Sequence, residues 1–391
     1  MASCAPMRSV LLVGCLSLWS CSATPSGDAG VGGGGGTATG GGTATGGGAA
    51  TGGGAATGGG TATGGGTATG GGTATGGGGG STTLAGLFER EHGWNKDVSA
   101  LPASTRSAAI IGALQGFGGW GNGNRLQIDF SIALLTADTA TPRRTITAAP
   151  GGYCYGGPDC DTVPLQMPMP ANGNTEGSAD YTCDTANNDC HVLVVERSEK
   201  KLYELYNATA AGSNFTALGA FVWDLTKQYG EVLRGDQCTS ADAAGLPIAA
   251  LLPTADEVAA GDVPHALRFI LPNARMKRQV YVRPATHAGG PSSTNADAPP
   301  YGVRFRLKAS FDETPYNANA RVILRALKKY GMILSDGGNI ALTFADDRLS
   351  TAKWSALNIT AQTFNSIGVG EFEVVDLGAE IPLTFNCVRA P

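Results

Sequence analysis

The stretch His191-Val-Leu-Val-Val-Glu-Arg-Ser-Glu-Lys-Lys-Leu-Tyr-Glu-Leu-Tyr206 decides the class of fold. Its two apolar runs, 191–195 and 202–206, lie on either side of a polar turn, and this pattern predicts a β-hairpin. Short runs rich in β-branched and aromatic residues recur along the rest of the chain. They predict further strands at 221–225, 266–271, 280–283, 303–309, 371–375 and 381–385.

Few helices are expected beside these strands. Residues 104–114 have the composition of a short capped helix, and 352–359 are a second short candidate. The strongest candidate is 319–330, because its apolar residues fall on one face and Gly331 follows at the expected C-cap. The strands outnumber the helices and do not alternate with them. We therefore expect a mainly β (α+β) fold, an antiparallel β-sandwich or jelly-roll-like domain with a few peripheral helices.

The first part of this chain of 391 residues cannot build a hydrophobic core. Residues 1–21 resemble a lipoprotein-type signal peptide. Residues 22–82 are a Gly/Thr/Ala-rich flexible tether, in which the hexamer Gly-Gly-Gly-Thr-Ala-Thr recurs with hardly a charge. Residues 83–391 are predicted to form a single extracellular, disulfide-bonded domain. The formal net charge of −5 argues against a nucleic-acid-binding protein.

The N-terminus is typical of an export signal. Arg8 precedes an apolar run over 10–19, which is shorter than the roughly 20 residues that span a bilayer. Leu12-Val-Gly-Cys15 and Leu18-Trp-Ser-Cys21 both resemble a lipobox, and we favour lipidation at Cys21 because the apolar run before it has the better length. An ordinary cleaved signal peptide is the alternative. We expect an exported protein that is either secreted or held on the outer membrane or cell surface by a lipid anchor only.

The remaining cysteines support export. Six of them lie outside the N-terminal segment, and an even number in an exported chain predicts three disulfides: Cys154, Cys160, Cys183, Cys190, Cys238 and Cys387. Short loops favour Cys154–Cys160 and Cys183–Cys190, which leaves Cys238–Cys387, although the connectivity is formally open. No pair has the CxxC spacing of a zinc site.

Several common catalytic motifs are missing from the sequence. It contains no G-x-S-x-G elbow, no H-E-x-x-H and no Walker loop. Gly116-Phe-Gly-Gly-Trp-Gly121 matches G-x-G-x-x-G, but it follows a helical stretch rather than a strand, which favours an ordinary loop. No cofactor is expected. Calcium at the oxygen-rich loop Asp184-Thr-Ala-Asn-Asn-Asp189 is the one alternative, and its spacing is not that of an EF-hand.

Basic residues concentrate on one strand. In 303–309 the bases Arg304, Arg306 and Lys308 alternate with apolar residues, so they share one face. That face is either a solvated surface or a strip that binds an anionic ligand such as a uronic-acid polymer. The bases on the predicted helix 319–330 favour a solvated face.

The densest group of polar residues lies between Cys238 and His287. It supplies the candidate catalytic residues Asp242, Glu257, His265 and His287, with Arg268 as a candidate substrate-binding residue in a pocket. Two carboxylates would serve as the acid and base of glycoside hydrolysis. A histidine beside an arginine or lysine would instead neutralise a uronate and abstract a proton in a lyase. The structural alternative is that Asp242 caps a turn and Glu257 starts a helix.

These features predict a surface-tethered extracellular carbohydrate-active enzyme that cleaves a polysaccharide, as a glycoside hydrolase or a polysaccharide lyase. The size of the domain favours an enzyme over a small sugar-binding module. The alternative is a non-catalytic cell-surface protein that binds a glycan or a partner cell. A third interpretation is a hydrolase with a non-standard triad built on Ser240.

A string of motifs resembles a family of secreted bacterial and fungal proteins. It includes Ser240-Ala-Asp-Ala-Ala-Gly-Leu-Pro-Ile248, Asp256-Glu-Val-Ala-Ala-Gly261, His265-Ala-Leu-Arg-Phe269, Pro284-Ala-Thr-His287, Arg306-Leu-Lys-Ala-Ser-Phe-Asp312 and Leu327-Lys-Lys-Tyr-Gly-Met-Ile333. The resemblance spans roughly 94–375. It implies one extracellular unit and no particular reaction. The Gln-Cys before Thr239 departs from the pattern, so the disulfide at Cys238 is expected to be particular to this branch.

Overall fold

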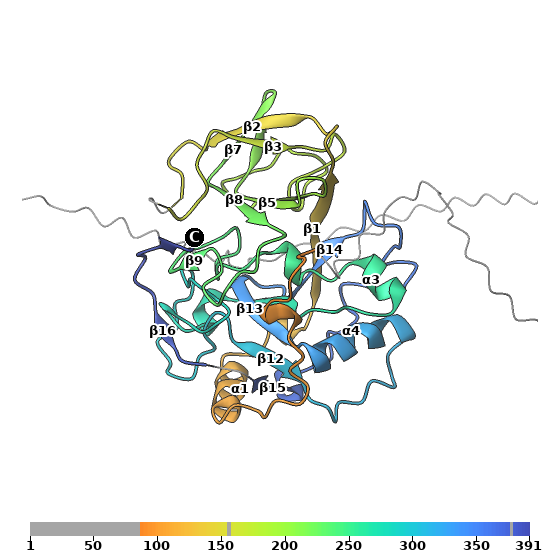
Figure 1. Ribbon diagram of the computed structural model, residues 1–391. Helices are drawn as coiled ribbons and strands as arrows, with labels where there is room; N and C mark the ends of the chain where they lie inside the picture. Colours follow the sequence, from red (N-terminus) through yellow and green to blue (C-terminus); the bar gives the residue numbers. More distant parts are fainter. Residues whose placement is uncertain (1–86, 155–157, 376–377) are drawn as a thin grey trace, which may run out of the picture. The chain divides into compact units, whose positions relative to one another are not determined.

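The computed structural model describes residues 87–154, 158–375 and 378–391 (Figure 1). The expected signal peptide, the lipidation at Cys21 and the tether over 22–82 lie outside the described residues. Strands dominate the described part and helices are few, which bears out the expectation of a mainly β fold. None of the helices in this part is long and apolar enough to cross a membrane.

The largest sheet has nine strands. Their order is β15 (Phe372–Val375), β12 (Arg304–Leu307), β13 (Met332–Gly337), β10 (Leu267–Leu271), β14 (Leu342–Asp346), β1 (Ile128–Ala137), β4 (Val192–Glu196), β5 (Lys201–Tyr206) and β8 (Gly219–Asp224). The sheet is mixed, where an antiparallel sandwich or jelly roll was expected. Strand β1 is parallel to both β14 and β4, and β10 is parallel to β13. The parallel pairs join strands that are far apart in the chain, so no turn motif in the sequence predicts this pairing.

Strand β1 links the two halves of this sheet. Its first residues pair with β14, and its last residues pair with β4. The hairpin of β4 and β5 follows, with Val192 opposite Leu205 and Glu196 opposite Lys201. Figure 1 shows β1 running from the region of β14 toward the second sheet. One strand therefore contributes to both hydrophobic clusters of the domain.

A second sheet of four strands packs on the smaller cluster. Its order is β3 (Leu165–Pro168), β2 (Arg143–Ala148), β7 (Asn214–Ala217) and β6 (Thr209–Ala211). Ile146 and Phe215 from this sheet meet Leu135 and Val194 from the large sheet in a shared apolar layer. Two short pairs complete the strands: β11 (Val280–Tyr281) with β16 (Ile381–Pro382), and β9 (Gly235–Asp236) with β17 (Val388–Arg389).

The helices lie around the large sheet (Figure 1). They are α1 (Ser107–Gly116), α2 (Gly121–Asn124), α3 (Ala255–Ala260) and α4 (Ala318–Lys329), with single 3-10 turns at Gly93–Asn95, Ala249–Leu251, Asn273–Arg275 and Val369–Glu371. Helix α4 matches the strongest sequence signal. The Asn317 side chain accepts from Ala320 N, and Gly331 adopts a positive φ of 70° just beyond the helix.

The helix expected at 352–359 is replaced by turns. The backbone N–H groups of Thr351 and Ala352 donate to Asp256, and that of Trp354 donates to Asp347. Side-chain oxygens thus bind the N–H groups at the start of this segment, and local turns form instead of a helix.

Candidate functional site

Glu257 and His265 form a closed pair inside the domain. Glu257 belongs to a capping box at the start of α3, where Thr254 N donates to Glu257 Oε2 at 2.9 Å. His265 Nε2 lies 3.5 Å from Glu257 Oε1, and its Nδ1 lies 2.9 Å from Ala266 O. Both side chains are buried. Glu257 thus lies at the start of a helix, which is the structural alternative given for it above. Neither Glu257 nor His265 lines a pocket that the structure describes.

His287 is also buried and its Nδ1 lies 2.9 Å from Ala243 O. Burial lowers the pKa of His287 below its ordinary value. Ser240 lies at the wall of a pocket, but its hydroxyl donates to Leu246 O and Asp242 O, which are backbone groups of its own turn. A triad on Ser240 would need that hydroxyl beside a histidine, and the described residues place none within hydrogen-bond distance of it.

The basic face of β12 is not an exposed strip. Arg304 donates to the carbonyls of Lys96 and Gly93, and Arg306 donates to those of Val98, Ser99 and Leu101 and to Glu373. Both arginines are buried under the loop that precedes α1. Lys308 donates to Gly370 O. A loop covers this face of the strand, and the three basic side chains anchor the strand to the segments around it.

Arg268 stands at the centre of a buried ion network. From β10 its guanidinium donates to Asp242 at 3.2 and 3.3 Å, to Asp336 Oδ2 at 3.0 Å and to Thr343 Oγ1 at 2.8 Å. The Asp242 side chain is 0% exposed and that of Arg268 is 4% exposed. Burial raises the pKa of Asp242 above its ordinary value, and the charge of the Arg268 guanidinium opposes this shift. Of the sequence candidates, Asp242 and Arg268 are thus brought together.

A second network lies beside the first. His191 Nδ1 is 2.7 Å from Glu176 Oε2, and His191 Nε2 is 3.0 Å from Ala241 O. Burial opposes a charge on His191, but the Glu176 carboxylate outweighs it and raises the pKa of His191 to about 9. Burial likewise opposes the charge of Glu176, and His191 outweighs it and lowers the pKa of Glu176 to about 2. Ser131 Oγ donates to Glu176 and to Asp129, which extends the network to β1.

Both networks border one pocket of about 350 Å³, which we call the Asp189–Asp336 pocket. Asp336 at the end of β13 reaches it with a side chain that is 19% exposed, while Asp189 lies exposed at its rim. Desolvation at the pocket wall raises the pKa of Asp189, and the charges of Asp336 and Glu176 add to this against the effect of His191. Aromatic and cystine side chains complete the wall: Tyr153, Tyr206, Phe221 and Cys154–Cys160.

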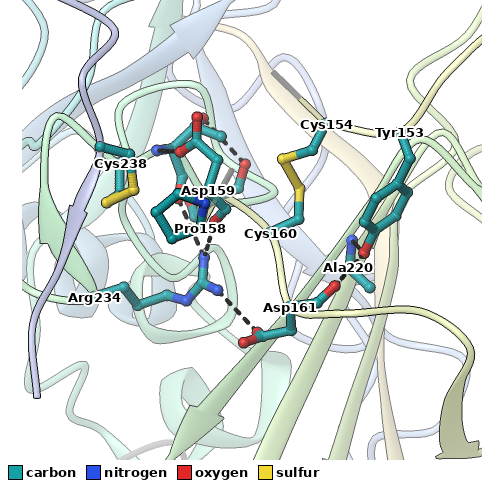
Figure 2. Close-up of a disulfide and its surroundings, with 12 residues drawn as sticks. Tyr153, Cys154, Pro158, Asp159, Cys160, Asp161, Ala220, Arg234 and Cys238 are labelled. Atoms are coloured by element: carbon teal, nitrogen blue, oxygen red, sulfur yellow. Dashed lines mark hydrogen bonds and ion pairs between the residues drawn. A yellow bond between two sulfur atoms is a disulfide. The ribbon is translucent and has the colours of Figure 1, made fainter. Parts of the chain in front are cut away.

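A web of hydrogen bonds and ion pairs holds the wall beside this disulfide in place (Figure 2). Arg234 donates to the carbonyls of Asp159 and Thr239 and pairs with Asp161 at 2.8 Å. The guanidinium also lies over the ring of Phe221, with its central carbon 4.9 Å from the ring centroid. Tyr153 OH donates to Asp161 O at 2.6 Å. The described part of this wall is therefore fixed to the sheet by side chains from several segments.

The disulfides join Cys154 to Cys160, Cys183 to Cys190 and Cys238 to Cys387, the pairs that loop length favoured. Asp159 lies close to Cys238 and Cys387, but their sulfurs are bonded to each other and offer no thiolate to a metal. In the loop closed by Cys183–Cys190, the Asp184 carboxylate accepts from Ala186 N and Asn187. Asp184 and Asp189, the two carboxylates of the loop considered as an alternative calcium site, thus have different surroundings.

Two further grooves, of about 580 and 810 Å³, lie near Glu91–Lys96. The arginines of the larger one make structural contacts. Arg283 pairs with Asp236 at 2.8 Å, and Arg304 holds backbone carbonyls. These grooves lack a pair of carboxylates with the environments seen at Asp189 and Asp336.

Sequence reasoning missed Asp336 as a site residue and took Asp189 only as a calcium candidate. A signal for Asp336 exists, since it follows the apolar run Met332–Leu334 after one serine and directly precedes Gly337-Gly338. Nothing in the sequence indicates that Asp189 lies near it. No family model matches the chain, and the comparisons find no similar curated protein and no similar solved structure.

Proposed function

We propose that this protein is an exported glycoside hydrolase that cleaves a polysaccharide at the Asp189–Asp336 pocket. The observation that carries the proposal is one pocket that combines two carboxyl groups in different environments with aromatic side chains. Sites for small organic groups are concave, largely apolar and equipped with a few placed polar groups, and this pocket fits that description.

The two carboxyl groups suit different roles. Glycoside hydrolysis needs a protonated acid beside the leaving oxygen and an ionised carboxylate on the other side of the sugar. Desolvation raises the pKa of Asp189 above its ordinary value, which favours Asp189 over Asp336 for the role of the acid. Asp336 has Arg268 as a counter-charge at 3.0 Å and is thus suited to act as the base or the nucleophile. Tyr206 and Tyr153 would bind the faces of the sugar rings.

Export fits the same proposal. Three disulfides within the described residues are typical of an oxidising compartment. Together with the signal peptide and tether expected from the sequence, they support an enzyme that Cys21 anchors to the cell surface. Polysaccharides are accessible substrates in that location. Of the two reactions considered, hydrolysis is favoured over uronate elimination. Among the described residues that line the pocket, none is a lysine, arginine or histidine that would neutralise a uronate.

The test measures the release of reducing ends from a panel of neutral, amino and uronic-acid polysaccharides. The full chain is produced with its disulfides formed and compared with Asp336→Asn and Asp189→Asn. We expect each variant to lose turnover by about a hundredfold or more while it keeps its thermal stability. Asp184→Asn is the matched control, because it removes the same charge from the same cystine loop outside the pocket.

Three outcomes decide between the candidate functions. Loss of turnover in both pocket variants, with Asp184→Asn active, supports hydrolysis at this site. Unsaturated products that absorb in the ultraviolet would replace the hydrolase by a lyase. Retention on one polymer without any turnover would replace the enzyme by the alternative, a surface protein that binds glycan.

A further inference from the structure

The charges around the Asp189–Asp336 pocket are predominantly negative. Among the described residues that line it, Asp189 and Asp336 are the only charged ones. Directly behind the wall lie further carboxylates, since Asp242 shares Arg268 with Asp336, and Glu176 and Asp129 share Ser131. The cations of the two networks are Arg268 and His191. A cleft lined by one sign of charge concentrates the field of its walls on whatever enters it.

Neither cation is free to meet a ligand. The same holds for Arg234 behind Phe221, which is buried and bonded to Asp161 and to the carbonyls of Asp159 and Thr239. The Arg268 guanidinium is bonded to Asp242, Asp336 and Thr343, and its side chain is 4% exposed. Both ring nitrogens of His191 are bonded as well, to Glu176 and to Ala241 O, and the ring is buried. A carboxylate or sulfate on a ligand would therefore face Asp189 and Asp336 with no opposite charge within reach.

We propose that the Asp189–Asp336 pocket takes a sugar that carries an ammonium group, as in a polymer of deacetylated hexosamine, with the cation between these two carboxylates. This inference rests on the proposed function and names its substrate class. The oligomer binds while Asp189 is ionised, before this residue takes up the proton that an acid needs. The ammonium group then offsets the repulsion between Asp189 and Asp336 and donates a hydrogen bond to a carboxylate oxygen. Tyr153 and Tyr206 also line the pocket, and aromatic rings attract a cation. An N-acetylated or neutral sugar has the same ring but lacks the charge.

The test is a binding measurement, so it does not depend on turnover. Short glucosamine oligomers, their N-acetylated forms and galacturonate oligomers are titrated into the full chain in the cold at about pH 6, where the amine is protonated. The ligands are checked for cleavage afterwards. We expect the deacetylated oligomer to bind at least about tenfold more tightly than the N-acetylated one, with a preference that falls as salt is added.

Two variants test whether the preference for the amine arises at the Asp189–Asp336 pocket. Asp189→Asn should remove most of the preference for the amine, because it deletes one of the two charges and keeps the shape of the side chain. Asp184→Asn should leave the preference unchanged, because Asp184 lies in the same loop outside the pocket. The folding of both variants is checked by their melting temperatures.

The outcomes separate this inference from the proposed function. Equal binding of the deacetylated and N-acetylated oligomers, or tighter binding of galacturonate, would overturn the inference, and hydrolysis of a neutral polymer would then still stand. A preference for the amine that Asp189→Asn abolishes supports the inference even where no oligomer is cleaved. A preference equally reduced by Asp184→Asn would mean non-specific attraction and would overturn it.

Discussion

At the scale of single residues, Arg268 connects the side chains of the candidate site, because it binds Asp242, Asp336 and Thr343 together. Replacing it by methionine leaves Asp242 fully buried without its counter-charge and frees Asp336 from its anchor. We expect Arg268→Met to lower the free energy of unfolding by about 3–5 kcal/mol, measured by urea denaturation. Arg325→Met is the control, because Arg325 is 65% exposed and should change stability by at most about 0.5 kcal/mol. Equal stability of the two variants would contradict this account.

Glu204 provides a test by pH at the same scale. It is fully buried and accepts from Trp223 Nε1 and Ala249 N, and burial raises its pKa from 4.5 to about 7. The folded protein therefore binds a proton that the unfolded chain has released, so stability falls as pH rises from about 4.5 to about 7. The loss should total about 3 kcal/mol.

Glu204→Gln should remove this contribution. Its amide oxygen keeps one of the two hydrogen bonds, and the loss of the other lowers stability by the same amount at every pH. The measurement is the difference in unfolding free energy between wild type and variant along the pH series, in which the titrations of Asp242 and His191 cancel. We expect the wild type to lose stability relative to the variant across that interval. Parallel pH curves would show that Glu204 has an ordinary pKa.

At the scale of elements, β12 is joined to the loop before α1 by Arg306. Its guanidinium binds Val98 O, Ser99 O and Leu101 O together with Glu373. We expect Arg306→Met to destabilise the protein by about 2–4 kcal/mol, because buried carbonyls and a carboxylate lose their donors. Protease cleavage should appear first near Val98–Leu101.

Lys308→Met on the same face of the chain is the matched comparison for Arg306. Lys308 makes one hydrogen bond, to Gly370 O, and is only half-buried. Its loss should cost less than about 1 kcal/mol and leave the loop resistant to protease. If Arg306→Met cost as little as Lys308→Met, the hydrogen bonds of Arg306 to the loop before α1 would contribute little to stability, which would contradict this account.

At the scale of the whole molecule, Cys238–Cys387 ties the C-terminal segment back across 149 residues of chain. Strands β9 and β17 are only two residues long, so their own pairing holds this segment weakly. Replacing both cysteines by alanine should lower the unfolding free energy by about 5 kcal/mol in the chain-entropy account, and the melting temperature should fall accordingly.

The matched variant for the long disulfide removes Cys183–Cys190, which closes a loop with a separation of only seven residues. The same account predicts a loss of about 2.5 kcal/mol there. A smaller loss for the long disulfide than for the short one would mean that the C-terminal segment is held mainly by its ion pair, Arg389 with Asp161.

The sequence by itself determined the local features of this protein. The hairpin of β4 and β5, helix α4 with its caps at Asn317 and Gly331, and the two short disulfides follow from patterns within a dozen residues or so. Hydrophobic periodicity, cap chemistry and loop closure act over such distances. The same locality explains why Asp242 and Arg268 were found as candidates, since they lie in one polar stretch.

Only the tertiary structure decided the sheet order and the site. The parallel pairing of β1 with β14 and β4 depends on packing between distant strands, and it places Asp189 and Asp336 at one pocket although 147 residues separate them (336 − 189). Alternation in β12 showed that its two faces differ, but the loop that covers Arg306 decided that the charged face is buried. Burial by remote segments is a property of the folded chain, and no local pattern of residues encodes it.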